Sequence, residues 1–287
     1  MKLSRQKLLA YAHLMRLHRP IGIYLVLWPT LWALWLAAEG IPSWQNLCIF
    51  VLGVVLMRSA GCVINDFADR KIDGQVQRTQ DRPLVTGAAS SREALILFCG
   101  LCIVAFILVL FTNRLTILLS FGAVLLASAY PFMKRHTHLP QVVLGAAFAW
   151  SVPMAFSAQA EEINPAIWVV YATVVLWTVA YDTFYAMVDR EDDLKIGVKS
   201  TAILFGEQDK FMTGFLQFLT VFSLAIIGQR FELGNIYKLS LLLVSLLFVY
   251  QQYLIAERKP DMCFKAFLNN NYVGFVVFAG IAMDYAF

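Results

Sequence analysis

Charged residues are scarce in this sequence of 287 residues. Only 15% are Asp, Glu, Lys or Arg, against about a quarter in typical soluble domains, whereas 60% are hydrophobic and the mean hydropathy is +0.66. A soluble fold of this length could not cover so much apolar surface. The composition therefore excludes a soluble globular domain as the first interpretation, and it also excludes a disordered or collagen-like chain.

Cysteines are also few, and their spacing indicates no disulfide framework. Cys99 and Cys102 form a CxxC pair, but no second pair and no His pair accompanies them, so neither a zinc site nor a disulfide scaffold is expected. Cys263 falls in a segment that reads as a polar loop. The N-terminal residues lack the apolar stretch of a secretory signal, so we expect the first apolar run to be an uncleaved membrane span.

Long apolar runs, in contrast, recur along the whole chain. A helix needs about 20 apolar residues to cross a bilayer, and about nine segments meet that requirement. We expect an interfacial helix over residues 1–20, followed by one all-helical, polytopic domain over residues 21–287. The predicted spans are residues 21–38, 44–65, 94–111, 115–132, 139–157, 166–188, 211–228, 237–256 and 268–286.

The distribution of Lys and Arg orients these spans. If the N-terminus and every second connection lie on one side, that side holds nineteen of the 23 cations and the other holds three, with Arg58 inside the second span. The positive-inside rule places the basic side in the cytoplasm, and the C-terminus on the opposite side. Two cytoplasmic connections, residues 66–93 and 189–210, are long and polar, as functional loops often are.

An acidic cluster ends the second span. Asn65, Asp69 and Asp73 are spaced four residues apart, so a continuous helix would carry them on one face, with Asp66 beside them. Carboxylates about 6 Å apart on a helix repel one another, and at a membrane boundary they are costly. Mg²⁺ is the natural compensating ion, because it binds one or two protein carboxylates and keeps its other positions for water and phosphate oxygens.

A second acidic cluster ends the sixth span, four spans later. Asp189 and Asp193 repeat the four-residue spacing, and Asp182 lies two turns upstream. The matching positions of the two clusters indicate two four-helix halves in parallel orientation, each with one cluster, and a ninth helix added.

Basic residues accompany both clusters. Acidic clusters flanked by cations at the mouth of an apolar bundle fit a diphosphate with a long apolar tail, although the charges could also form a solvated rim of mutual ion pairs. Arg58 shares a face with Asn65, and we expect it to have a functional role or to pair with Asp66 or another carboxylate. The flanking cations are Arg70, Lys71, Arg78, Arg82, Lys134, Arg135, Lys195 and Lys199.

These motifs resemble the signatures of a known family. Asn65-Asp66-x-x-Asp69-x-x-x-Asp73, followed by Arg78-Thr79-x-x-Arg82-Pro83-Leu84, is similar to the first signature of the UbiA superfamily of intramembrane prenyltransferases, and residues 181–201 resemble the second. The segments around Pro20, Trp28, Arg58 and Tyr130 most resemble the members that act on 4-hydroxybenzoate. The resemblance covers nearly the whole chain.

The resemblance implies an all-helical bundle with a central cavity open to the cytoplasmic side and to lipid. It implies Mg²⁺-dependent transfer of a polyprenyl chain from polyprenyl diphosphate to the ring carbon ortho to the hydroxyl of 4-hydroxybenzoate. This reaction belongs to ubiquinone biosynthesis in the bacterial inner membrane and involves no nucleic acid.

The resemblance also implies roles for individual residues. Mg²⁺ and the diphosphate are expected on Asp69, Asp73, Asp189 and Asp193, with Asn65 and Asp66 assisting. The diphosphate oxygens are expected on Lys134, Arg135 and Lys199, and the allylic cation beside an aromatic ring such as Tyr130, Tyr181 or Tyr185. Arg58 is expected to bind the carboxylate of the acceptor.

Two alternatives remain open. The first is a prenyltransferase of the same superfamily with another acceptor, which would be haem, a naphthoate or a chlorophyllide. A membrane transporter also fits many spans with internal repeats, but transporters place charges near the bilayer midplane, whereas the acids here cluster at one face.

Overall fold

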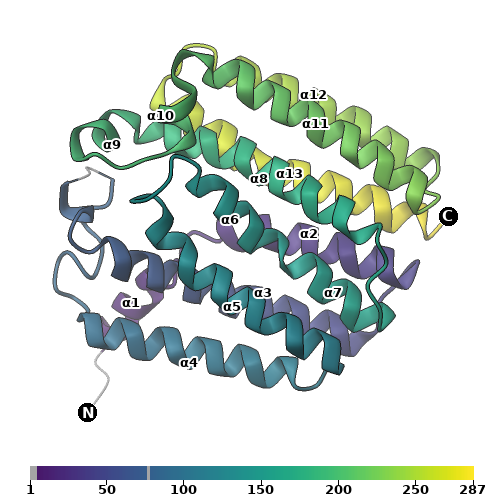
Figure 1. Cartoon of the computed structure of the whole chain (residues 1–287), viewed down its shortest axis with the longest axis horizontal. Coiled ribbons are helices and arrows are strands. Elements are labelled where there is room, and N and C mark those ends of the chain that lie inside the picture. Colours follow the sequence, from purple (N-terminus) through teal and green to yellow (C-terminus); the bar gives the residue numbers. More distant parts are fainter. Residues whose placement is uncertain (1–4, 76–77) are drawn as a thin grey trace.

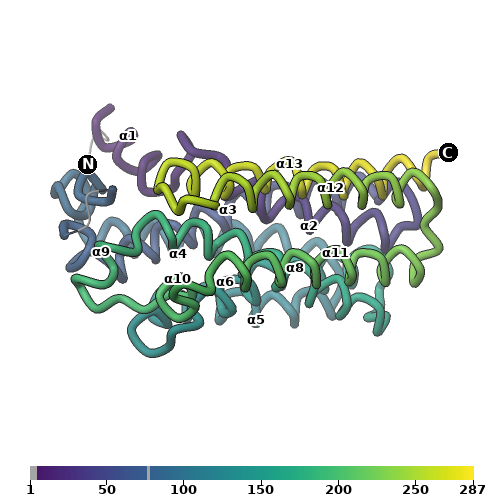
Figure 2. The backbone as a smooth tube through the Cα atoms, turned by 90° about the horizontal axis from the view of Figure 1, so that it is seen from above, coloured from purple at the N-terminus to yellow at the C-terminus, as the bar shows by residue number. Residues whose placement is uncertain are grey.

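Helices form all the regular structure in residues 5–75 and 78–287, the part of the chain that the computed structural model describes. Nine segments in this part are long and apolar enough to cross a membrane, which confirms the sequence prediction. They run alongside one another, and α1 and the C-terminus lie at opposite ends of the bundle (Figure 1, Figure 2). The helices are α1 (Arg5–Leu14), α2 (Ile21–Ala38), α3 (Trp44–Asp69), η1 (Asp73–Gln75), α4 (Ser91–Val109), α5 (Arg114–Met133), α6 (Pro140–Ala149), α7 (Ser151–Ala160), α8 (Ile167–Val188), α9 (Arg190–Ile196), α10 (Thr201–Phe205), η2 (Gly206–Gln208), α11 (Asp209–Arg230), α12 (Asn235–Leu254) and α13 (Pro260–Asp284).

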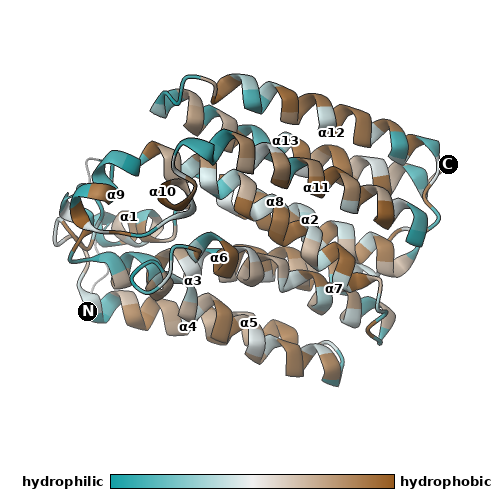
Figure 3. Ribbon diagram, turned by 45° about the horizontal axis from the view of Figure 1, so that its top comes forward, coloured by the Kyte–Doolittle hydropathy of each residue, from teal (hydrophilic) through white to brown (hydrophobic). Residues whose placement is uncertain are grey.

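The surface of the bundle is apolar along its length and polar at its ends. Hydrophilic residues gather around α1 and α9 at one end and in the turns at the other (Figure 3). Between them, large apolar side chains such as Leu118, Leu125 and Phe218 are more than 60% exposed, which is favourable only in contact with lipid. The chain is therefore a multi-pass membrane protein.

The packing follows the two predicted halves. Each half contains a closely packed pair of consecutive spans, α3 against α4 in the first and α8 against α11 in the second. The opening spans of the two halves also pack together, α2 against α7, and α13 lies against α2, α8 and α12. Aromatic side chains join the halves in the core, where the rings of Trp32 and Trp177 stack with centroids 5.4 Å apart and both are buried.

The fifth span is broken into α6 and α7 at Trp150. Pro153 lies in the first turn of α7 and has no N–H to donate to the carbonyl of Ala149, so one hydrogen bond of the helix is missing at this point. The break lies beside the cavity described below, because residues of both helices line that cavity.

The N-terminal helix α1 is held against the bundle by Glu93. This carboxylate closes a capping box with Ser90 at the start of α4, and it also accepts hydrogen bonds from Lys7 at 3.0 Å and Tyr11 at 2.9 Å. Leu14 of α1 is fully buried in a small apolar cluster. Residues 1–4 of the predicted interfacial segment 1–20 lie outside the described residues.

Two local expectations were wrong. The helix of the second span ends at Asp69, so Asp73 is not on its face but in the separate turn η1. Cys263 is not in a loop. Pro260 occupies the first position of α13, so the helix begins earlier than predicted and includes Cys263, whose side chain is completely buried.

Candidate active site

A cavity of about 770 Å³ lies inside the bundle and has one polar end. Its lining comes from α1 and the segment after it, from α2 to α9 and α13, and from the loops that follow α3, α5 and α9. The cavity is balanced in charge, because its lining holds seven Asp side chains and seven Arg or Lys side chains. The acids are Asp66, Asp69, Asp73, Asp81, Asp182, Asp189 and Asp193, and the cations are Arg16, Arg19, Arg58, Arg78, Arg82, Lys134 and Lys199.

Arg82 brings Asp73 close to the rest of the first acidic cluster, although α3 ends before Asp73. Its guanidinium lies 3.0 Å from Asp66 on the last turn of α3 and 2.7 Å from Asp73 in η1. Asp66 also pairs with Arg16 from the N-terminal segment at 2.9 Å. The loop after α3 therefore folds back over the cluster, and Asp73 reaches the same cavity by a route other than a continuous helix.

Lys134 and Arg135, at the end of α5, have different positions. Lys134 forms an ion pair with Asp69 in the cavity. Arg135 is exposed and donates to the Ala68 carbonyl, so it holds the end of α3 and does not line the cavity. The other ten predicted site residues also line the cavity: Arg58, Asn65, Asp66, Asp69, Asp73, Tyr130, Tyr185, Asp189, Asp193 and Lys199.

Arg78 connects the two acidic clusters. It follows the first cluster in sequence, yet its guanidinium binds Asp189 of the second cluster, with Nη2 2.5 Å from Oδ2 and Nε 2.9 Å from Oδ1. The same guanidinium lies over the ring of Tyr185, 4.7 Å from its centroid. Asp193 sits one turn after Asp189 at the start of α9, with its N–H bonded to the Asp189 carbonyl at 2.9 Å.

Two carboxyl groups outside the spans are short of compensating charge. Burial raises the pKa of Asp73 to about 6, with Asp69 adding to the rise and Arg82 opposing it. Burial, and after it the charge of Asp189, raises the pKa of Asp193 to about 7. Both positions would therefore gain from an additional cation.

The donor set also fits a hard cation such as Mg²⁺. Asp66 Oδ2 and Asp69 Oδ1 are buried and have no hydrogen-bond partner, which is rare for carboxylate oxygens. Within residues 5–75 and 78–287, no three His, Cys, Asp or Glu side chains stand close enough to cage a metal ion alone. A cation here would need oxygens from a bound anion as well, which is the usual way in which Mg²⁺ binds.

Arg58 lies deeper in the cavity and has no carboxylate in salt-bridge distance among the described residues. Its Nη1 donates to the Cys62 thiol at 3.0 Å, its Nε has no partner, and its guanidinium lies 5.4 Å from the Phe148 ring centroid. Gly22 of α2 leaves room for it, because a Cβ at that position would come within 2.4 Å of Nε. The expected alternative, an ion pair between Arg58 and Asp66, is wrong, since Asp66 is taken by Arg16 and Arg82.

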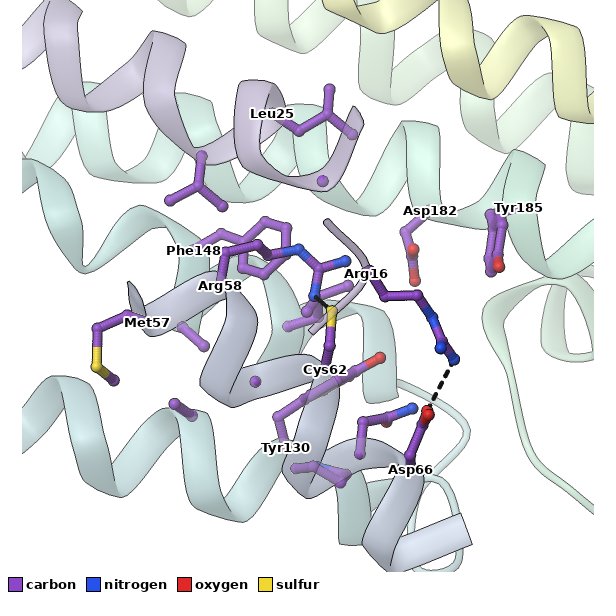
Figure 4. A pocket seen from close by; sticks show the side chains of 18 of the residues that line it. Arg16, Leu25, Met57, Arg58, Cys62, Asp66, Tyr130, Phe148, Asp182 and Tyr185 are labelled. Carbon is purple, nitrogen blue, oxygen red and sulfur yellow. Dashed lines mark hydrogen bonds and ion pairs between the residues drawn. The ribbon is translucent and has the colours of Figure 1, made fainter. Parts of the chain in front are cut away.

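The wall opposite Arg58 is built from side chains outside the set of site residues predicted from the sequence. Asp182 of α8 points into the same part of the cavity as Arg58 and Tyr130 (Figure 4). Gln141 of α6 lines the cavity too, and its side-chain oxygen accepts the Thr201 N–H at 3.0 Å. Tyr181 lines this region too, and its hydroxyl is buried without a partner. Asp182 could have been found from its position two turns before Asp189, whereas nothing in the sequence marks Gln141.

The sequence is similar to known prenyltransferases over most of its length. The profile of the UbiA prenyltransferase family matches residues 26–277. A 4-hydroxybenzoate octaprenyltransferase of Saccharophagus degradans is 68% identical over 277 residues, which cover 96% of this chain and 93% of that protein. A 4-hydroxybenzoate octaprenyltransferase of Hahella chejuensis is 61% identical over 283 residues, covering 99% of this chain and 94% of that protein.

Solved structures agree with the sequence comparison. The apo structure of a UbiA homologue from Aeropyrum pernix K1 has a TM-score of 0.80 at 27% identity, covering 92% of this chain and 97% of that one. A UbiA homologue from Archaeoglobus fulgidus bound to GPP and Mg²⁺ has a TM-score of 0.72 at 20% identity, which shows a shared fold, and covers 97% of this chain and 100% of that one. By its matched profile, its relatives and its fold, this chain belongs to the UbiA prenyltransferase family.

Proposed function

We propose that this protein transfers a polyprenyl chain from polyprenyl diphosphate to 4-hydroxybenzoate, at the ring carbon ortho to the hydroxyl, in ubiquinone biosynthesis. The observation that carries this proposal is one cavity with a polar end of paired acids and cations and an apolar remainder. The names of the relatives from Saccharophagus degradans and Hahella chejuensis support 4-hydroxybenzoate as acceptor and an octaprenyl chain as donor.

The diphosphate would bind where Arg78, Arg82 and Lys134 now pair with carboxylates. These cations would turn from Asp189, Asp73 and Asp69 to the phosphate oxygens, since a diphosphate offers more negative charge than any single carboxylate. Lys199 borders the same end of the cavity and would add a further contact. Arg135 would act indirectly, by holding the end of α3.

The freed carboxylates would bind Mg²⁺ together with the phosphate oxygens, on Asp69, Asp73, Asp189 and Asp193, with Asn65 and Asp66 beside them. The bound Mg²⁺ would neutralise negative charge on the leaving diphosphate. The unpartnered oxygens of Asp66 and Asp69 support this assignment. A protein of the same fold binds GPP and Mg²⁺.

The chain's own residues would then control the allylic cation and the acceptor. When the C–O bond breaks, the cation is shielded from water by the apolar wall and faces the rings of Tyr130 and Tyr185. Arg58 holds the acceptor's carboxylate, which orients the ring toward the cation. Asp182 interacts electrostatically with Arg58 and is our choice for the group that accepts the ring proton.

We also propose that the protein lies in the bacterial inner membrane with its N-terminus and active site facing the cytoplasm. The polar end of the cavity belongs to the end of the bundle that carries nineteen of the 23 cations. Nine spans then leave the C-terminus on the outer side. Reporter fusions at the C-terminus test this orientation, because a reporter active only in the cytoplasm should be silent there.

A competition experiment tests the reaction itself. The purified protein in lipid nanodiscs receives 4-hydroxybenzoate, 1,4-dihydroxy-2-naphthoate, haem and chlorophyllide together, with octaprenyl diphosphate and Mg²⁺. Mass spectrometry should find the chain on 4-hydroxybenzoate, at the carbon ortho to the hydroxyl. Transfer to one of the other three acceptors instead would contradict the proposed acceptor and leave the prenyl transfer intact.

A further inference from the structure

The second acidic cluster lies at a break between two helices. Asp189 stands between the last residue of α8 and the first residue of α9, with φ −97° and ψ 5°, so α8 and α9 are not one continuous helix. Asp193 lies one turn further, inside α9. The direction in which α9 leaves α8 therefore decides how the two carboxylates stand toward each other and toward the first acidic cluster.

Apolar packing does not fix this direction. The helix α9 has seven residues, none of them buried, and its Leu194 is 59% exposed. A helix of this length is not stable by itself in water. It lies at the polar end of the bundle, beyond the end of α8 (Figure 1). Polar contacts are therefore what can hold α9 in place.

The chain after α9 returns to the bundle at Lys199. The Lys199 N–H donates to the Lys134 carbonyl at the end of α5, at 3.1 Å. Two residues later, Thr201 is fully buried, and its hydroxyl lies 2.7 Å from that of Thr183 on α8. These contacts fix the chain that follows α9, but they leave the start of α9 to other contacts.

Arg190, the residue after Asp189, fixes the start of α9. Its Nη1 lies 3.1 Å from Oδ2 of Asp209, the first residue of α11, which is fully buried. Asp189 lines the cavity, whereas neither Arg190 nor Asp209 does, so two consecutive side chains point in different directions. The ion pair therefore lies outside the space that ligands would fill.

Asp209 does not depend on Arg190 alone for its compensation. Arg258, from the turn between α12 and α13, lies with Nη2 2.8 Å from Oδ1 and with Nε 3.0 Å from both carboxylate oxygens. The Lys210 N–H donates to Oδ1 at 2.7 Å. Asp209 therefore stays paired when Arg190 is replaced, so we expect the fold to survive that change.

Arg78 also holds the break between α8 and α9, but from the cavity side. It binds Asp189, and in the proposed function it turns to the diphosphate. Asp189 then loses this partner, whereas Arg190 and Asp209 lie outside the cavity and keep their contact. The pair of Arg190 and Asp209 is thus an ion pair beside the break that ligand binding leaves in place.

We propose that Arg190 and Asp209, called the anchor pair, hold α9 so that Asp189 and Asp193 keep the spacing that Mg²⁺ and a diphosphate require. Mg²⁺ demands near-ideal octahedral geometry with ligands at about 2.0–2.1 Å, so small shifts of a carboxylate weaken its binding. Both members of the pair are positioning residues, because neither lines the cavity. This inference rests on the proposed function, since it takes Mg²⁺ and the diphosphate to bind between the two acidic clusters.

A pair of arginine variants separates positioning from stability. Arg190→Ala should raise the Mg²⁺ concentration for half-maximal transfer about tenfold or more and leave the KM for 4-hydroxybenzoate unchanged, because it moves only the second acidic cluster. Arg258→Ala is the matched control. It removes the other arginine of Asp209 and should lower thermal stability at least as much, yet keep the Mg²⁺ requirement of the wild type. An equal rise in both variants, or no rise in Arg190→Ala, would overturn the proposal.

Two further replacements at Arg190 give a graded result. Arg190→Lys keeps the positive charge and should retain most of the wild-type Mg²⁺ affinity. Arg190→Gln keeps a hydrogen-bond donor without the charge, so its affinity should lie between those of Arg190→Lys and Arg190→Ala. A loss in Arg190→Lys as large as that in Arg190→Ala would contradict an ion pair with Asp209 as the cause.

Isothermal titration calorimetry measures the same effect without turnover. Mg²⁺, titrated into the purified protein with inorganic diphosphate present, should bind about tenfold more weakly to Arg190→Ala than to the wild type or to Arg258→Ala. Such weakening in a protein that transfers no prenyl chain would support the anchor pair and refute the proposed function. Normal transfer by the wild type, with equal Mg²⁺ affinity in all three proteins, would refute the anchor pair alone.

Distances between spin labels report the position of α9 directly. In a cysteine-free background, nitroxide labels on Leu194→Cys of α9 and Arg92→Cys at the start of α4 should give a narrow distance distribution, with and without Mg²⁺ and inorganic diphosphate. Both labelled positions are exposed, so the labels disturb no packing. Arg190→Ala should broaden the distribution, and more so with both ligands bound, because Arg78 then leaves Asp189. A distribution of wild-type width in Arg190→Ala would refute the proposal.

Discussion

Replacement of Arg58 by alanine should weaken acceptor binding and leave the fold intact. Arg58 has no carboxylate within salt-bridge distance among the described residues, so its removal breaks no ion pair, in contrast to the loss of Arg82, which pairs with both Asp66 and Asp73. Its Nε has no partner and its Nη1 contacts only the weakly accepting thiol of Cys62. The guanidinium is therefore available for a carboxylate ligand.

The size of the effect follows from the surroundings of Arg58. A hydrogen bond to a charged group contributes about 1.5–3 kcal/mol, and the site is walled by Phe148 and shielded from bulk water. At about 1.4 kcal/mol per factor of ten, the KM for 4-hydroxybenzoate should rise roughly 10- to 150-fold in Arg58→Ala. The KM for the prenyl diphosphate should change less than threefold, because Arg58 pairs with none of the carboxylates of the two acidic clusters.

Steady-state kinetics with two acceptors gives the decisive comparison. The wild type should lose affinity for the methyl ester of 4-hydroxybenzoate by about as much as Arg58→Ala loses for the acid, and the variant should no longer distinguish the two acceptors. Arg70→Ala is the matched control, because Arg70 binds the Phe67 carbonyl and ring and does not line the cavity. An unchanged acceptor KM in Arg58→Ala, or full discrimination against the ester in that variant, would refute the assignment.

Four further predictions concern the same site. EDTA should abolish transfer and excess Mg²⁺ should restore it; full activity in EDTA would exclude the metal. Asp69→Ala and Asp189→Ala should each lower kcat by about a hundredfold or more, against little change for the exposed Glu257→Gln, and near-normal turnover would remove that residue from the site. Asp182→Asn should slow turnover without raising the donor KM, and acceptor deuterated beside the hydroxyl should then react more slowly than unlabelled acceptor; an isotope effect no larger than that of the wild type would exclude Asp182 as the proton acceptor. Gly22→Ala should raise the acceptor KM by displacing the Arg58 guanidinium, with thermal stability close to that of the wild type, and an unaltered KM would show that Arg58 does not act from this position.

The spans were predictable because a bilayer imposes a length and a composition that appear directly in the sequence. The acidic clusters were predictable because charge at a membrane boundary is costly and therefore informative. The course of the chain after Asp69 was not, since the helix ends there and Arg82 restores Asp73 to the cluster through a contact between loop residues. Helical spacing gave the correct neighbours for Asp73, but for the wrong structural reason.

The direction in which individual side chains point could not be predicted from the sequence either. Lys134 and Arg135 are adjacent cations with the same apparent role, but the turn at the end of α5 sends the first into the cavity and the second to the Ala68 carbonyl. Gln141 has no charge and no motif, so its place in the cavity wall depends wholly on the packing of α6 against α8. Arg58 likewise has no ion pair with Asp66 because Arg16 and Arg82 already bind that carboxylate, and the sequence does not show which cations lie close to it.

The equal numbers of acids and cations that line the cavity have a consequence for the order in which ligands bind. A diphosphate that entered alone would take the cations and leave buried carboxylates facing one another, and a metal ion alone would strand the cations in the same way. Each ligand therefore removes the cost that the other creates, so the two should bind with positive cooperativity. By linkage, Mg²⁺ should tighten donor binding by the same factor by which the donor tightens Mg²⁺ binding.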